Sequence, residues 1–183
     1  MVPEPDWWRR EPGLWPLLDF DGGTDEDGLP CDASASDRRA LLEALLLERG
    51  ADGDGPRPGP RDRDLLLHLL RQETLWQRHA WGFGHSIGMA ALMVAEGRRP
   101  ADLWPLWEAK SASFDTMLGL PVELLYAAGG PDTVAFAEAA ARSRGASLLD
   151  YLGWAGTPDP EDVDRTLAAL RRRYTGLSGH RAP

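Results

Sequence analysis

The sequence predicts an all-α fold, either an irregular multi-helix bundle or stacked helical hairpins, with an irregular acidic N-terminal arm. The first observation is composition: the chain has one Ile and five Val, whereas Leu and Ala are abundant. Sheets depend on β-branched and aromatic residues, while Leu and Ala favour helices. The second observation is that short stretches with helical periodicity alternate with turns rich in Pro and Gly. The 183 residues, 43% of them apolar, suit one domain of ordinary size.

Residues 1–61 are predicted to form the irregular acidic arm, with one short helix. Residues 1–62 hold 15 acidic and 7 basic side chains, a net charge of −8, whereas the remaining residues hold 14 and 13, a net charge of −1. The short helix is expected over 36–50, because four leucines follow helical spacing and Gly50 can end it. Residues 50–61 have the composition of a flexible Pro/Gly linker.

Residues 62–176 are predicted to form the helical core domain, followed by a disordered tail over 177–183. The stretch from His85 to Glu96 is apolar almost all round, which is typical of a helix in the middle of a bundle. The last helix is expected to begin after Asp159 and to stop at Gly176. The other core helices are expected over 64–79, 102–117, 121–129, 131–145 and 147–154.

Composition also narrows the function classes. Neither part of the chain carries the basic face that nucleic-acid binding requires. No stretch approaches the ~20 apolar residues of a membrane span. The N-terminus lacks the basic start and apolar segment of a signal peptide. We therefore expect a cytoplasmic protein with neither a nucleic-acid partner nor a membrane partner. The single cysteine, Cys31, excludes an internal disulfide.

Residues 84–88 match the pattern G-x-S-x-G, the nucleophile elbow of α/β-hydrolases, with Ser86 as the nucleophile. That elbow requires a buried strand before the serine, and the preceding residues contain no β-branched run. His180, which would complete a Ser, Asp, His order, falls in the expected tail. A serine hydrolase is therefore kept only as the third alternative.

No metal site or cofactor is predicted. The acidic run Asp19–Asp27 resembles a calcium loop, but Gly and Pro occupy positions where oxygen ligands belong, which favours a solvated turn. The sequence contains no HExxH and no Glu-x-x-His of the kind that holds metals in helical bundles.

The only lysine of the chain, Lys110, falls in the middle of an apolar stripe on the helix expected over 102–117. A buried unpaired charge is costly, so we expect a carboxylate partner, with Glu73 and Glu96 as the candidates. Three interpretations stay open. Lys110 forms a buried ion pair, or it extends to the edge of the stripe, or it forms with a glutamate, His85 and the adjacent Ser86 a polar pocket that binds a ligand.

Tryptophans are the candidate anchors for a protein partner, because aromatic side chains often dominate interfaces. Trp7, Trp8 and Trp15 suit either the core or a partner surface equally. The others of interest, Trp76, Trp81, Trp104 and Trp107, are expected in the core.

The stretch Leu103–Thr116, together with Asp25–Pro30, resembles small α-helical proteins of unknown function from high-GC bacteria, some of them similar to immunity partners of secreted toxins. The resemblance implies a helical binding protein and supplies no catalytic residues.

Our leading hypothesis is a non-enzymatic helical protein-interaction module, such as an immunity or accessory protein, with a protein partner. The alternative is a small helical enzyme or ligand-binding protein that uses a polar pocket around Lys110.

Overall fold

The computed structural model describes residues 4–50, 59–144 and 147–179, and within these ranges it contains helices and no strand. An isolated antiparallel bridge joins Thr24 and Pro30. The all-α prediction is therefore confirmed. The elements in chain order, with 3-10 helices labelled η, are α1 (Pro5–Arg10), η1 (Pro12–Leu18), α2 (Ala35–Glu48), α3 (Pro60–Gln77), α4 (His85–Ala95), η2 (Pro100–Asp102), α5 (Leu103–Lys110), α6 (Phe114–Gly119), η3 (Val122–Tyr126), α7 (Gly130–Arg144), α8 (Ser147–Ala155) and α9 (Pro160–Gly179).

Helix α4 forms the centre of the molecule, as its apolar sequence predicts. Every residue from Ile87 to Ala95 is buried. Its neighbours are α2, α3, α5, α9 and η3, which surround it on all sides. Small residues let these neighbours approach closely: Gly88 lies against Tyr174 of α9, where a Cβ would come within 1.9 Å of the phenolic oxygen. The core is thus built outward from α4.

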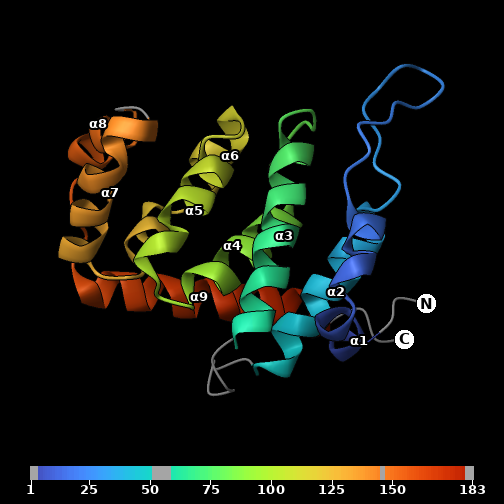
Figure 1. Ribbon diagram of the computed structural model, residues 1–183, viewed down its shortest axis with the longest axis horizontal. Coiled ribbons are helices and arrows are strands. Elements are labelled where there is room, and N and C mark those ends of the chain that lie inside the picture. Colours follow the sequence, from blue (N-terminus) through green and yellow to red (C-terminus); the bar gives the residue numbers. More distant parts are fainter. Residues whose placement is uncertain (1–3, 51–58, 145–146, 180–183) are drawn as a thin grey trace.

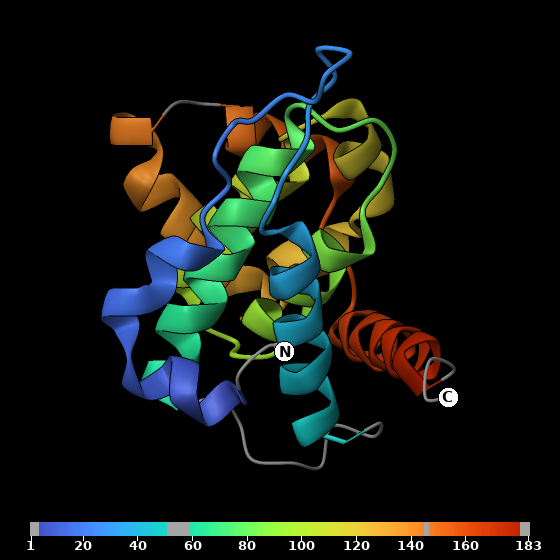
Figure 2. The same ribbon diagram turned by 90° about the vertical axis from the view of Figure 1, so that its right-hand side faces the viewer.

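The other elements stand on or around the long final helix. Figure 1 shows α9 running along the base of the molecule, with α3, α5 and α7 upright above it. Figure 2 shows α9 nearly end-on beside the lower part of α2, in agreement with the contacts between those helices. The α3–α4 connection, α6 and α8 lie at the opposite, upper end in both views.

The N-terminal segment is less irregular than we expected. Helices α1 and η1 precede a loop over residues 19–34, and Trp8 and Leu18 belong to the buried core. The leucine stripe predicted for the first long helix is present, since Leu41, Leu42, Leu45 and Leu46 of α2 are all buried. They share one core cluster with α3, α4 and α9, so the packing is continuous across residue 61, where the arm was predicted to end.

The predicted linker over 50–61 partly overlaps the start of α3. Pro60 occupies the first helical position, where its missing N–H costs nothing. Asp62 accepts a hydrogen bond from the Gly59 backbone N–H at 2.8 Å, which fixes the start of the helix. Residues 51–58 of that predicted linker lie outside the described residues.

The single helix predicted over 102–117 is wrong, because the chain breaks into α5 and α6. Ser113 caps α6: its hydroxyl accepts a hydrogen bond from the Thr116 N–H at 3.2 Å, and the Thr116 hydroxyl accepts one from the Ser113 N–H at 2.9 Å. This reciprocal capping starts a new helix at Phe114. The expected stripe through Lys110 and Phe114 is therefore interrupted, and the Phe114 side chain faces solvent.

The predicted end of the last helix also needs correction. Gly176 does not stop α9, which continues to Gly179. The first three residues of the tail predicted to be disordered, 177–179, are thus helical. Residues 180–183, including His180, lie outside the described residues.

Candidate functional site

Lys110 is buried, with 3% of its surface exposed, and it meets neither of the carboxylates predicted for it. Its ammonium donates hydrogen bonds to the backbone oxygens of Met117, at 2.6 Å, and Leu120. These carbonyls belong to the end of α6, where the helix leaves acceptors without an internal partner. The interpretation as a buried ion pair with Glu73 or Glu96 is therefore wrong. Lys110 instead ties the last turn of α5 to the end of α6.

The environment of Lys110 explains why a lysine suits this position. The ammonium lies 5.6 Å from the centre of the Tyr151 ring, between α6 and α8. Burial lowers the pKa of Lys110, while the nearby Glu123 opposes that effect. A compact ammonium can reach two convergent carbonyls, whereas the planar fork of an arginine directs its donors differently. Lys110, the only lysine of the chain, thus fixes the end of α6 relative to α5.

Glu73, one predicted partner of Lys110, is occupied elsewhere. It accepts a hydrogen bond from Arg38 Nε at 2.7 Å, and both side chains are almost fully buried. Arg38 also pairs with Asp32 and donates to the Leu18 backbone oxygen at 3.1 Å. Burial raises the pKa of Glu73, and Asp32 adds to this, while Arg38 opposes it. This cluster fastens η1 and the loop after it to α2 and α3.

Glu96, the second predicted partner, joins three helices at the base of the molecule. It pairs with Arg49 at 2.7 Å and accepts a hydrogen bond from Arg171 Nε at 2.6 Å. Arg171 is 2% exposed and also donates to the Gly50 backbone oxygen at 2.9 Å. Glu96 therefore stabilises the contact of α4 with the end of α2 and with α9.

His85 and Ser86 share a hollow with Glu73 but not with Lys110. The hollow, of about 490 Å³, lies between α2, α3 and the start of α4. Burial lowers the pKa of His85, and Arg173 and Arg39 lower it further. The structure has no strand before Ser86 in the part of the chain it describes, so the nucleophile elbow is not formed. The polar pocket hypothesised around Lys110 is thus not formed as one site. Glu73, His85 and Ser86 line the hollow, whereas Lys110 lies beside α6 and Tyr151.

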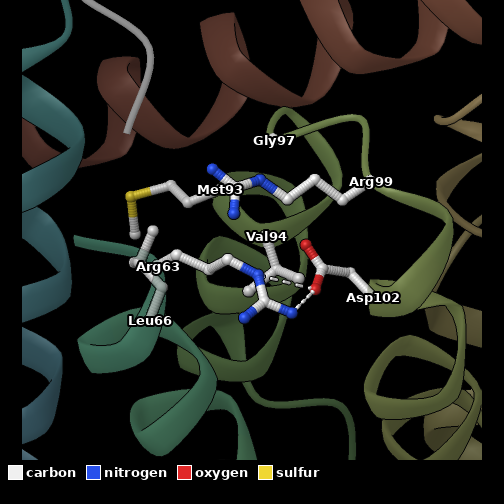
Figure 3. A pocket seen from close by; sticks show the side chains of 7 residues that line it. All are labelled: Arg63, Leu66, Met93, Val94, Gly97, Arg99 and Asp102. Carbon is white, nitrogen blue, oxygen red and sulfur yellow. Dashed lines mark hydrogen bonds and ion pairs between the residues drawn. The ribbon is translucent and has the colours of Figure 1, made fainter. Parts of the chain in front are cut away.

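A second enclosed space lies between the start of α3, the end of α4 and the Gly97–Asp102 segment (Figure 3). Arg63 reaches across it and pairs with the buried Asp102, as the dashed lines in Figure 3 mark. Its volume of about 10 Å³ admits no more than one water molecule. The Arg63–Asp102 pair therefore joins α3 to η2, and the space beside it has no room for a ligand.

The three N-terminal tryptophans, for which the core and a partner surface were equally expected, pack against the molecule. Trp8 is 4% exposed, and Trp7 and Trp15 are half-buried against the core. The Trp15 indole donates a hydrogen bond to the Trp8 backbone oxygen at 2.9 Å, and the Trp7 and Trp8 rings meet edge to face. These side chains fix η1 and α1 in place.

Exposed aromatic side chains occur elsewhere, two of them at positions that were expected to be buried. Trp81, which we expected in the core, is 96% exposed, and Phe114 of the expected stripe is 77% exposed. Leu118 and Trp154 are 71% and 83% exposed. All four belong to the α3–α4 connection, α6 and α8, the elements at the upper end of Figure 1. We call these four residues the aromatic end.

The aromatic end is held by specific contacts. The Gly82 backbone N–H donates to Asp115 of α6 at 2.9 Å. Phe83 packs on Gly119 so closely that a Cβ there would come within 2.4 Å of the ring. On the other side, Trp107, Tyr151 and Trp154 form a row of rings with centroid distances of 5.0 and 5.9 Å. This site could not be predicted from the sequence, because Trp and Phe are typical core residues and the stripe through Phe114 is broken only by the capping at Ser113, where α6 begins.

The described residues contain no group of three or more His, Cys, Asp and Glu side chains placed to hold a metal ion. Among those same residues, no helix is long and apolar enough to span a membrane. Comparison of the chain with family models, with curated proteins and with solved structures gave no match.

Proposed function

We propose that this protein is a non-enzymatic helical protein-interaction module and that the aromatic end is its binding face. The observation that carries the proposal is the exposure of Trp81, at 96% of its surface, beside Phe114 and Leu118. Single exposed apolar residues are ordinary on protein surfaces, but a group of large aromatic ones at one end of a molecule is characteristic of a partner site. Tryptophan is also the residue most enriched among interface anchors.

The rigidity of the aromatic end supports the same proposal. The Trp81 turn is held to α6 through Gly82 and Phe83, and Lys110 fixes the end of α6. A surface that is ordered before binding loses less conformational entropy when the partner docks. An immunity or accessory role, which the resemblance of Leu103–Thr116 implies, is one form of this function. Lys110 would then position the binding face without touching the partner.

The ligand-binding alternative is supported by the hollow between α2, α3 and α4. It is large enough for a small molecule, and Glu73, His85 and Ser86 give it polar side chains. No hydrogen bond joins these three side chains to one another in the described structure. For this reason we place the alternative second to the aromatic end.

Affinity capture with matched variants tests the proposed function. The intact protein serves as bait in an extract of its own cells, alongside the double variant Trp81→Ser, Trp154→Ser and the control Leu47→Ser. Leu47 is 51% exposed on α2, so the control removes exposed apolar surface away from the aromatic end. We expect a protein that the wild type and the control retain and the double variant loses. Equal retention by all three baits would contradict the aromatic end as the binding face.

A further inference from the structure

A second surface, separate from the aromatic end, lies between α3 and α5. It is a groove of about 410 Å³. One continuous face of α3 forms its floor and one wall, and Pro105 of α5 forms part of the other wall. The apolar lining comes from Leu67, Leu70, Leu75 and Pro105.

Three charged side chains stand on the rim of this groove. Arg71 of α3 and Arg78, which directly follows α3, are exposed on the α3 side, and Glu108 is exposed on the α5 side. None of the three takes part in the ion pairs formed within residues 4–50, 59–144 and 147–179. Arg71 and Arg78 are seven positions apart, which places them on the same side of α3 with a rise of ~10.5 Å between them.

The shape of the groove favours an extended occupant over a compact one. From Leu67 to Arg78 it follows α3 for ~16 Å, the length of about three helical turns. An apolar floor with charged edges is the lining that receives an amphipathic helix, whose apolar face enters the groove while its polar edges stay at the rim. A ligand with charge alone would leave the leucine floor uncovered.

We propose that the α3–α5 groove binds an amphipathic helix of a partner protein. On one edge this helix carries two acidic side chains seven positions apart, opposite Arg71 and Arg78. On its other edge it carries a basic side chain, opposite Glu108. The two guanidiniums set the spacing of the acids, and the single carboxylate sets the direction in which the helix lies. The leucine floor supplies affinity through buried apolar area, and the rim charges supply specificity.

The acidic charge of the whole chain does not oppose this assignment. The net charge is −9, but charges separated by more than a Debye length of ~8 Å are largely screened at physiological salt. The groove therefore presents its local charge to a docked helix. The inference does not depend on the proposed function, because none of the groove's lining residues belongs to the aromatic end.

Two synthetic helical peptides test the inference. Each is stapled in helical form and carries leucines on one face. The first has two glutamates seven positions apart on one edge and a lysine on the other, and the second has these charges exchanged. Fluorescence anisotropy measures the binding of both peptides to the intact wild-type protein. We expect the first peptide to bind more tightly than the second by on the order of tenfold, from a few exposed charge pairs.

Charge reversal in the protein completes the test. The variant Arg71→Glu, Arg78→Glu should reverse the preference, and Leu75→Arg, which introduces a charge into the apolar lining, should abolish binding of both peptides. Arg172→Glu, an exposed change on α9, should leave the preference unchanged. Circular dichroism verifies that each variant is folded. The inference is overturned if the wild type binds neither peptide, if it binds both equally, or if the double reversal does not change which peptide it prefers.

Discussion

At the scale of single residues, the buried charges of this protein explain its local architecture. Glu73 and Glu96 were the candidate partners of Lys110, yet each of the three side chains serves a different contact. Lys110 meets backbone carbonyls, Glu73 meets Arg38, and Glu96 meets Arg49 and Arg171. The requirement that buried charges find partners is therefore satisfied, by nearby backbone carbonyls for Lys110 and by arginines distant in the sequence for the two glutamates.

Replacement of Lys110 tests its part in fixing α6. In Lys110→Met the carbonyls of Met117 and Leu120 lose their common donor, and we expect a loss of about 1–3 kcal/mol in the free energy of unfolding. Urea denaturation measures the change. Arg172→Met, an exposed substitution on α9, should stay within about 0.5 kcal/mol of the wild type. A Lys110→Met variant as stable as this control would show that the ammonium does not hold α6.

Glu73 gives a prediction for pH. Burial raises its pKa in the folded state above the ordinary value of 4.5. Between the two values the folded protein binds more protons at this site than the unfolded chain, so the contribution of Glu73 to stability falls as pH rises through that window. Glu73→Gln removes this dependence. The stability of the variant minus that of the wild type should therefore increase with pH.

Chemical denaturation from about pH 4 to about pH 8 measures that difference, with both proteins in the same buffers. Other titrating groups cancel in the subtraction as long as their surroundings are unchanged. Because Arg38 keeps Asp32 as its partner in Glu73→Gln, the buried guanidinium is not left alone. A difference that is flat or falls with pH would contradict the raised pKa of Glu73.

At the scale of elements, the sequence predicts helices well where a stripe of apolar residues is continuous. The stripe through Leu41 and Leu46 locates α2, and the wholly apolar stretch from Ile87 to Ala95 identifies α4 as the central helix. The break between α5 and α6 could not be predicted from periodicity, since Phe114 continues the stripe of α5 in register. That break depends on the capping at Ser113 and on the carbonyls that Lys110 reaches.

The other incorrect predictions, of the partners of Glu73 and Glu96 and of the position of Trp81, depend on contacts between elements distant in the sequence. Arg38 and Glu73 are 35 residues apart, and Arg171 and Glu96 are 75 residues apart. Helical spacing shows that such side chains are buried, but it does not show which helices become neighbours. The same reason explains Trp81: its composition suits a core, and only the position of its turn against α6 places it in solvent.

The close approach of α4 and α9 is tested with a pair of glycine substitutions. A Cβ at Gly88 would come within 1.9 Å of the Tyr174 oxygen, and the Tyr174 ring is buried and cannot turn away freely. We expect Gly88→Ala to destabilise the protein by about 1–3 kcal/mol through overpacking. Thermal and urea denaturation measure the effect.

The matched control is Gly153→Ala in α8, where a Cβ meets nothing within 4 Å. Alanine is the better helix former, so this variant should be as stable as the wild type or gain up to about 1 kcal/mol. If Gly88→Ala were also neutral or stabilising, α4 and α9 would have to be packed less closely than the structure indicates.

At the scale of the whole molecule, the ion pairs that stabilise the fold and the proposed binding surfaces lie in different places. The base, where α9 meets α2 and α4, is held by Glu96 and its arginines. The upper end carries the exposed aromatic residues, and the flank between α3 and α5 carries the groove. Changes to exposed residues of either surface should therefore alter binding without unfolding the base.

Because one hydrophobic core includes residues from both sides of residue 61, a fragment that lacks the N-terminal helices should be unstable. A chain that begins at residue 59 contains all of the core domain expected from the sequence, 62–176. It lacks α2, whose Leu41 and Leu46 are fully buried, and it lacks the Leu46 and Gly50 oxygens to which Arg171 donates. We expect this fragment to have no cooperative thermal unfolding transition when followed by circular dichroism.

A cleavable version of the full chain provides the control. With a protease site inserted between residues 50 and 59, the folded protein is cut after purification, so both pieces are present in their native arrangement. The buried leucines of α2 and the Arg171 contacts then still connect the two pieces, and we expect them to elute together in gel filtration and to unfold in one transition. A fragment from residue 59 onward that unfolds cooperatively alone would instead show that the core domain expected over 62–176 folds without the N-terminal arm.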